Sequence, residues 1–98
     1  MLPKDLLEPL GLDALLVTRP ENVRYLSGFP HPEDAQVLVT GEGAFLLTDP
    51  RYPEAERESR IPAKVLRREE REALLKTLKG RVGFEAEHLP YAALERLR

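Results

Sequence analysis

Cysteine is absent from the chain, which excludes disulfide bonds, thiolate metal sites and thiol catalysis. Histidine occurs only twice, and His31 and His88 stand far apart and belong to no spaced ligand motif. The two serines, Ser27 and Ser59, lack the Gly-x-Ser-x-Gly setting of a nucleophilic serine. We therefore expect neither a metal site nor a catalytic serine within this chain.

Long apolar runs are also missing. No stretch approaches the length needed to span a membrane, and the N-terminus lacks the basic and apolar segments of a signal peptide. The 15 basic and 17 acidic side chains nearly cancel, which leaves a formal net charge of −2. A chain so balanced has no strong field to attract a polyanion. We expect a cytoplasmic protein whose partners include neither a membrane nor a nucleic acid.

Amide side chains are scarce, since Asn22 is the single asparagine and Gln36 the single glutamine. Abundant charge combined with few thermolabile amides is typical of heat-adapted proteins and predicts a thermostable domain. A GC-rich genome would favour arginine, alanine and proline as well, and this second explanation of the composition stays open.

The order of apolar patterns predicts the fold class. The 98 residues suffice for one small domain with a modest core. Runs of strand length lie at 12–17, 36–48 (divided by a glycine turn at 41–43), 63–66 and 81–85. Helical patterns lie at 2–10, 19–27, 49–60, 69–80 and 90–98. This alternation predicts an α/β layered domain with a mixed, largely parallel sheet that contains one hairpin and is flanked by helices.

Local signals predict where two of these helices begin and end. Thr18 and Glu21 have the spacing of a capping box at the start of the second helix. Gly28 should end that helix in the left-handed conformation. The helix of residues 49–60 should begin near Asp49, with Asp49 or Tyr52 as its cap.

Two pairs of side chains have alternative interpretations. Arg51 and Tyr52 are candidate interface residues, because arginine and tyrosine often anchor a partner chain. Alternatively, Asp49 caps a helix and the tyrosine folds onto the sheet. Asn22 and Tyr25 present the same choice between local hydrogen bonds and a contact outside the domain. By composition and motif alone, the chain is an α/β domain without visible catalytic residues.

Three phrases, in order and at suitable spacing, resemble a known family. They are "LDALLVTRPENVRYLSGF" (12–29), "VLVTGEGAFLLTDPRYPEAE" (37–56) and "VGFE" (82–85). Together they resemble the N-terminal domain of the creatinase/prolidase family, which includes Xaa-Pro aminopeptidases and dipeptidases with a pita-bread catalytic domain. The likeness covers most of the chain and implies an α/β domain with a mixed sheet, placed ahead of the catalytic domain.

The resemblance also implies that catalysis belongs to a C-terminal domain outside these 98 residues. There, carboxylates and a histidine would hold two divalent metal ions, which activate water to cleave the bond before proline. The helical pattern at 90–98 ends without a cap, so we expect residues 1–98 to be an N-terminal domain that is truncated before its last strand. Alone, this domain should not hydrolyse peptides.

In relatives, the N-terminal domains pack in a dimer so that the loop after the "YLSGF" phrase approaches the partner's active site. Here that loop contains the candidate substrate-access residues Phe29, His31 and Glu33, with Pro30 and Pro32 to stiffen it. The implied partners are a second copy, in a homodimer, and a proline-containing peptide at the partner's active site. The alternative for His31 is an exposed loop histidine without a role.

Two rival functions stay open. The creatinase branch would hydrolyse a small guanidino compound and needs no change of fold. A stand-alone binding or regulatory module needs no downstream catalytic half. The gene sequence beyond codon 98 separates these classes, because a peptidase parent requires spaced Asp, Asp, His, Glu and Glu ligands and a free-standing module requires a stop codon.

Overall fold

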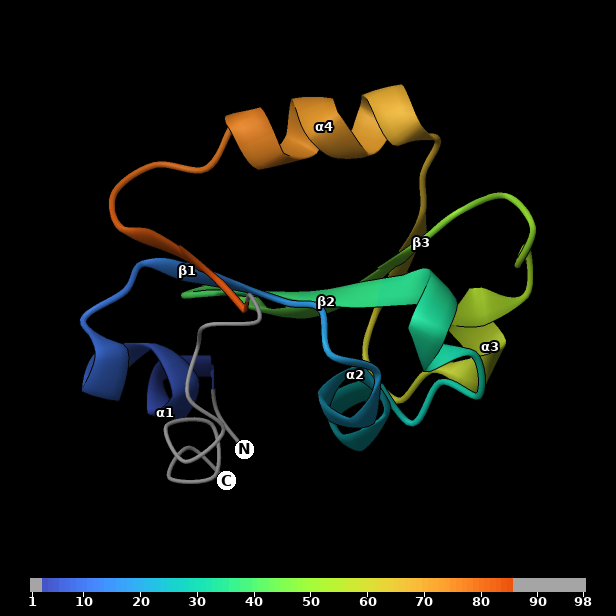
Figure 1. Ribbon diagram of the computed structural model, residues 1–98, viewed down its shortest axis with the longest axis horizontal. Helices are drawn as coiled ribbons and strands as arrows, with labels where there is room; N and C mark the ends of the chain where they lie inside the picture. Colours follow the sequence, from blue (N-terminus) through green and yellow to red (C-terminus); the bar gives the residue numbers. More distant parts are fainter. Residues whose placement is uncertain (1–2, 86–98) are drawn as a thin grey trace.

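The computed structural model describes residues 3–85, which form a five-stranded sheet with helices on both faces (Figure 1). The strands are β1 (Ala14–Val17), β2 (Ala35–Thr40), β3 (Gly43–Thr48), β4 (Ala63–Val65) and β5 (Val82–Phe84). The α-helices are α1 (Pro3–Leu7), α2 (Pro20–Ser27), α3 (Ala55–Glu58) and α4 (Arg68–Lys76), and the short 3-10 helices are η1 (Glu8–Leu10) and η2 (Pro32–Asp34). The helix predicted at 90–98 lies outside the described residues.

The strand order is β4-β3-β2-β1-β5. The central strand β2 is antiparallel to β1 and β3, whereas β4 is parallel to β3 and β5 is parallel to β1. The predicted α/β class and mixed sheet are confirmed, and β2 alone among the described strands runs against the others. Because this reversed strand lies at the centre, two of the four described strand pairs are antiparallel, a larger share than the sequence suggests.

Strand β1 is covered on both faces, which explains its continuous apolar run. All of its residues are buried. Leu15 and Val17 belong to one core and Leu16 to a second core, as expected for side chains that alternate between the two faces of a strand. Helices α1, α2 and α3 cover the face of the first core, and α4 covers the opposite face (Figure 1). The first core also contains Leu6, Leu7, Val23, Phe29, Ala35, Val37, Val39, Leu46 and Ala55, and the second contains Leu38 and Leu47 with Leu74, Leu75 and Leu78 packed against them.

The predicted hairpin is confirmed. Strands β2 and β3 pair in register from Ala35 opposite Thr48 to Thr40 opposite Gly43, so the turn consists of residues 41–42. No helix within residues 3–85 combines the length and apolar character that crossing a membrane requires.

The helix predicted to begin near Asp49 begins only at Ala55, and neither Asp49 nor Tyr52 caps it, so this prediction is wrong. Asp49 Oδ1 instead accepts a hydrogen bond from the backbone N–H of Arg51 at 2.9 Å. The backbone N–H of Tyr52 donates to the carbonyl of Asp49 at 3.0 Å. An aspartate that accepts from the backbone two residues ahead closes a turn and thereby competes with helix formation.

The predicted end of α2 is confirmed, whereas the predicted cap at its start is wrong. Gly28 ends the helix with φ +70, as predicted, and its N–H donates to the carbonyl of Arg24 at 2.7 Å. The capping box of Thr18 and Glu21 is wrong, because the N-cap residue is Arg19 and no local side chain caps the helix. A carboxylate from a distant part of the chain occupies this position, as shown below.

Replacing Gly28 by alanine should lower the free energy of unfolding by about 1–2 kcal/mol, because an L-residue is strained in the left-handed conformation. An added Cβ would also lie only 2.9 Å from Arg60 Nε. Chemical denaturation measures the loss. The matched control is Gly41→Ala in the hairpin turn, where an added Cβ meets no atom within 4 Å. Equal stability of the two variants would contradict the prediction.

Candidate functional site

The register of the hairpin brings two separate segments together at one end of strands β2 and β3. Ala35, the first residue of β2, lies opposite Thr48, the last residue of β3. The loop 29–34 therefore lies beside the segment 49–52. The sequence predicted an access loop in the first segment and interface residues in the second, and the structure makes them neighbours.

Phe29, His31 and Tyr52 form an aromatic cluster at this end of the strands. Phe29 is fully buried, and its ring meets the rings of His31 and Tyr52 edge-on with centroid distances of 5.6 Å. His31 stacks on Tyr52 with centroids 4.9 Å apart. Edge-to-face and stacked aromatic pairs at such distances are attractive beyond the area that they bury. The cluster therefore fixes the half-buried His31 against the domain.

Charged groups surround the cluster. The hydroxyl of Tyr52 donates to Asp34 Oδ2 at 2.5 Å, and Arg51 Nη2 lies 3.3 Å from Asp34 Oδ1. Arg51 also holds Asp49 with two hydrogen bonds, Nε to Oδ1 at 2.9 Å and Nη2 to Oδ2 at 2.7 Å. The guanidinium lies 5.6 Å from the centre of the Tyr52 ring. Asp34 thus links both halves of the site through its two oxygens.

These contacts shift the pKa values of Tyr52 and Asp49 in opposite directions. The hydrogen bond to Asp34 raises the pKa of Tyr52 above its ordinary 10.0, and burial and the nearby negative charge add to this. The hydrogen bond from Arg51 lowers the pKa of Asp49 below its ordinary 3.8. Tyr52 is therefore neutral and Asp49 ionised at neutral pH.

Glu33 lies in η2 and is exposed. Within the described part of the chain its side chain takes no part in the hydrogen bonds of the cluster, although its charge contributes to the raised pKa of Tyr52. Phe29, His31 and Tyr52 are therefore in mutual contact and Arg51 lies against the Tyr52 ring, whereas Glu33 lies outside these contacts.

A polar hollow of about 350 Å³ adjoins the cluster. Acidic and basic side chains line it in equal number: Glu33, Asp34, Asp49, Arg51, Arg68 and Arg71. Across residues 3–85, no three His, Asp or Glu side chains gather so that they could hold a metal ion. The metal ions that the family resemblance implies have no ligand set in this part of the chain.

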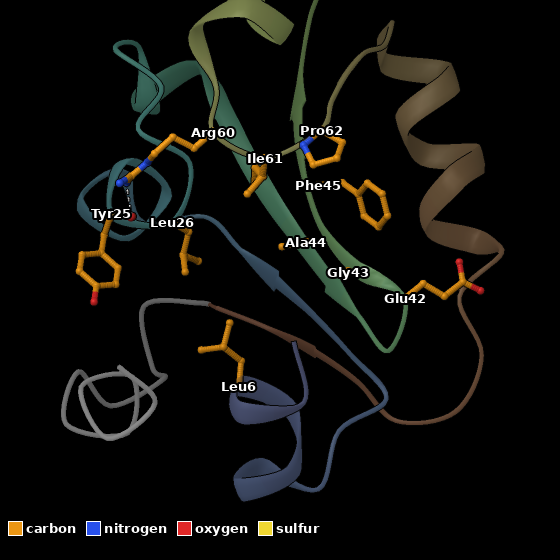
Figure 2. A pocket seen from close by; sticks show the side chains of 10 residues that line it. All are labelled: Leu6, Tyr25, Leu26, Glu42, Gly43, Ala44, Phe45, Arg60, Ile61 and Pro62. Carbon is orange, nitrogen blue, oxygen red and sulfur yellow. Dashed lines mark hydrogen bonds between the residues drawn. The ribbon is translucent and has the colours of Figure 1, made fainter. Parts of the chain in front are cut away.

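A second hollow of about 780 Å³ lies among α1, α2, the first half of β3 and residues 60–62 (Figure 2). Figure 2 shows Arg60 at one end and Glu42 at the other, with Leu6, Leu26 and Ile61 between them. The guanidinium of Arg60 donates to the carbonyl of Tyr25 at 2.9 Å. None of the predicted site residues lines this hollow.

Two residues that the sequence did not single out have central positions. Asp34 binds Tyr52 across 18 residues of sequence, and no local pattern indicates such a pairing. Glu85, the last residue of the "VGFE" phrase, is buried and binds the start of α2. Only its place in that phrase could have drawn attention to it.

A model of the creatinase/prolidase N-terminal domain matches residues 4–98. The chain belongs to this family. It is 33% identical over 91 residues to an Xaa-Pro dipeptidase of Pyrococcus horikoshii, and the alignment covers 90% of this chain and 25% of that protein. This creatinase/prolidase-type domain therefore spans about a quarter of the length of that relative.

Solved structures agree with this assignment. The prolidase of Pyrococcus horikoshii OT3 superposes with a TM-score of 0.70 and 31% identity over 97% of this chain and 28% of its own. The N-terminal domain of a putative metallopeptidase from Corynebacterium diphtheriae superposes with a TM-score of 0.67 and 34% identity. This match covers 94% of this chain and 77% of that chain. The N-terminal domain of the cytoplasmic peptidase PepQ from Mycobacterium tuberculosis H37Rv superposes with a TM-score of 0.70 and 29% identity. This match covers 97% of this chain and 80% of that chain. The predicted family is confirmed.

Replacing Tyr52 by phenylalanine keeps the ring contacts but removes the hydroxyl, and should lower the free energy of unfolding at neutral pH. The pKa of Tyr52 is higher in the folded chain than the ordinary 10.0. The stability due to the hydroxyl is therefore complete below pH 10 and is lost as the pH rises through the folded-state pKa. Denaturation of wild type and variant across the alkaline range should show a stability difference that shrinks as the pH rises.

Asp34→Asn is the companion variant, because it keeps an acceptor for the Tyr52 hydroxyl but removes the negative charge. Absorbance titration of the tyrosines should then find Tyr52 ionising at a lower pH than in wild type. If the stability difference between wild type and Tyr52→Phe does not change with pH, the raised pKa of Tyr52 cannot be assigned to its hydrogen bond with Asp34.

Proposed function

We propose that this chain is the N-terminal domain of an Xaa-Pro peptidase, where it serves dimerisation and substrate access, and that catalysis belongs to a following domain. The supporting observation is the likeness to a prolidase over 97% of this chain but only 28% of that protein. On this proposal the catalytic domain holds two divalent metal ions, which supply the activated water that cleaves the bond before proline. The whole protein acts in the cytoplasm.

The access role belongs to the loop 29–34. Phe29 is its buried anchor, and Pro30 and Pro32 restrict its backbone. His31, stacked on Tyr52, and the exposed Glu33 are the polar groups that face a proline-containing peptide at the active site of the partner subunit. A loop that is already ordered before binding costs little entropy when it meets a substrate.

The dimer role belongs to the adjacent Arg51 and Tyr52. Both side chains have partners within the chain, yet the side chain of Arg51 is 65% exposed. Its ion pairs with Asp49 and Asp34 fix the guanidinium in one orientation while one face stays accessible. On this proposal the second subunit packs against that face, beside the loop that enters its active site.

Expression of the whole reading frame that contains this chain tests the peptidase assignment. Cleavage of Xaa-Pro peptides should be abolished by a chelator and restored by Mn²⁺, Co²⁺ or Zn²⁺, because the expected metal ions activate the attacking water. The 98-residue chain should be inactive in the same assay. A guanidino substrate such as creatine serves as the comparison. A stop codon after position 98, metal-independent cleavage, or hydrolysis of the guanidino compound alone would contradict the assignment.

Loop variants of the whole protein test the access role. His31→Ala and Glu33→Ala should raise KM for an Xaa-Pro peptide more than they lower kcat, because the loop contacts substrate but not the reacting atoms. Glu42→Ala, at the exposed hairpin turn, is the control with unchanged kinetics.

Mixed dimers show whether the loop acts across the subunit interface. A subunit with an inactivated catalytic domain and an intact loop should restore normal KM to a partner that carries His31→Ala. No restoration in such mixed dimers would contradict the proposal that the loop serves the other subunit.

A further inference from the structure

Glu85 follows β5 and is a buried carboxylate, only 2% exposed. Its Oε1 accepts hydrogen bonds from the backbone N–H of Thr18 at 2.9 Å and of Arg19 at 2.5 Å. Its Oε2 accepts from Asn22 Nδ2 at 2.7 Å. All three donors belong to the first turn of α2 or to the two residues before it, so one side chain joins the last described strand to the second helix.

The backbone of Glu85 is held as firmly as its side chain. Its N–H donates to the carbonyl of Leu16 at 2.7 Å, and its own carbonyl accepts from the hydroxyl of Thr18. The position of the carboxylate is thus set by the parallel pairing of β5 with β1. A small shift of β5 along β1 would move the carboxylate away from its donors.

The arrangement is a capping box closed by a distant residue. In the usual box, the third residue of a helix is an acid that reaches back to the N–H of the N-cap residue. In α2 the third residue is Asn22, and its amide binds Glu85, whose carboxylate then accepts from the N-cap residue Arg19, 66 positions away. The carboxylate also lies at the positive end of the helix dipole, where negative charge is favoured.

The contacts continue through α2 to the access loop. At the far end of the helix, Ser27 Oγ donates to the carbonyl of Val23 at 2.6 Å and accepts from the N–H of Phe29 at 3.1 Å. Phe29 in turn contacts His31 and Tyr52. The eight residues of α2 span about 12 Å at the usual rise, so about two turns of helical backbone hydrogen bonds join its N-terminal cap to Ser27.

We propose that Glu85 is a positioning residue: by capping α2 from β5, it sets the position of the loop 29–34, whose access role rests on the proposed function above. A buried carboxylate that loses its partners is strongly unfavourable. The three hydrogen bonds therefore form together, and the docking of β5 and the order of α2 with its loop belong to one cooperative unit.

Hydrogen exchange on the 98-residue chain tests this coupling, with α4 as the internal reference for global opening. Glu85→Asp keeps the charge but is one methylene too short to reach the start of α2. Glu85→Gln keeps the reach and an acceptor for the backbone N–H groups but has no charge. Glu85→Asp should lower the protection of residues 18–34 about tenfold or more relative to α4, as expected for a lost cap. Glu85→Gln should preserve more of this protection.

Glu21→Gln is the matched control, because Glu21 lies in the first turn of the same helix but its carboxylate pairs with Arg19 at the exposed surface. It should exchange like wild type. An equal loss of protection in α4 and in residues 18–34 for the Glu85 variants would overturn the proposal. Wild-type protection in Glu85→Asp would overturn it as well, since charge without reach would then suffice. If Glu85→Asp does not fold, the protection of residues 18–34 relative to α4 is compared between Glu85→Gln and wild type. A loss confined to residues 18–34 supports the proposal, and an equal loss in α4 overturns it.

The exchange readout needs no peptidase activity, so its outcome is separate from that of the proposed function. Loss of local protection in a chain whose whole protein proves not to be a peptidase would support the coupling and contradict only the access role. In an active whole protein, Glu85→Asp should raise KM more than it lowers kcat, as a displaced access loop would.

Discussion

The burial of β1 on both faces is the constraint on which the rest of the structure depends. Its side chains enter two cores at once, and its edges pair with β2 on one side and β5 on the other. Because β1 ends beside Glu85, the same strand that organises the cores also fixes where α2 begins. The start of α2 in turn sets the positions of the helix, of the loop 29–34 and of the aromatic cluster.

Charge is used in two different ways in this domain. The surface pairs, such as Arg51 with Asp49 and Arg68 with Glu72, lie in contact with water and contribute little to stability. Glu85 is buried instead, and its carboxylate is satisfied by hydrogen bonds. Among the described residues, no buried side-chain nitrogen or oxygen lacks a hydrogen-bond partner.

The candidate site combines a paired set of charges with a fixed loop. Tyr52 is hydrogen-bonded to Asp34, Arg51 pairs with Asp34 and Asp49, and the loop 29–34 is held by the buried ring of Phe29. On the proposed function, this surface shapes access to a reaction performed by another domain. Membership of the creatinase/prolidase N-terminal family is consistent with this division of labour.

The sequence by itself determined the elements and the class of this fold, because apolar period, proline and glycine act locally: the doubly buried β1, the hairpin turn and the left-handed Gly28 are all readable from neighbours. It misplaced the start of α3, where the side chain of Asp49 closes a turn. Tertiary structure alone decided that Asp34 meets Tyr52 and that Glu85 caps α2. Such contacts join residues far apart in the chain, and they follow from strand register, which no local pattern specifies.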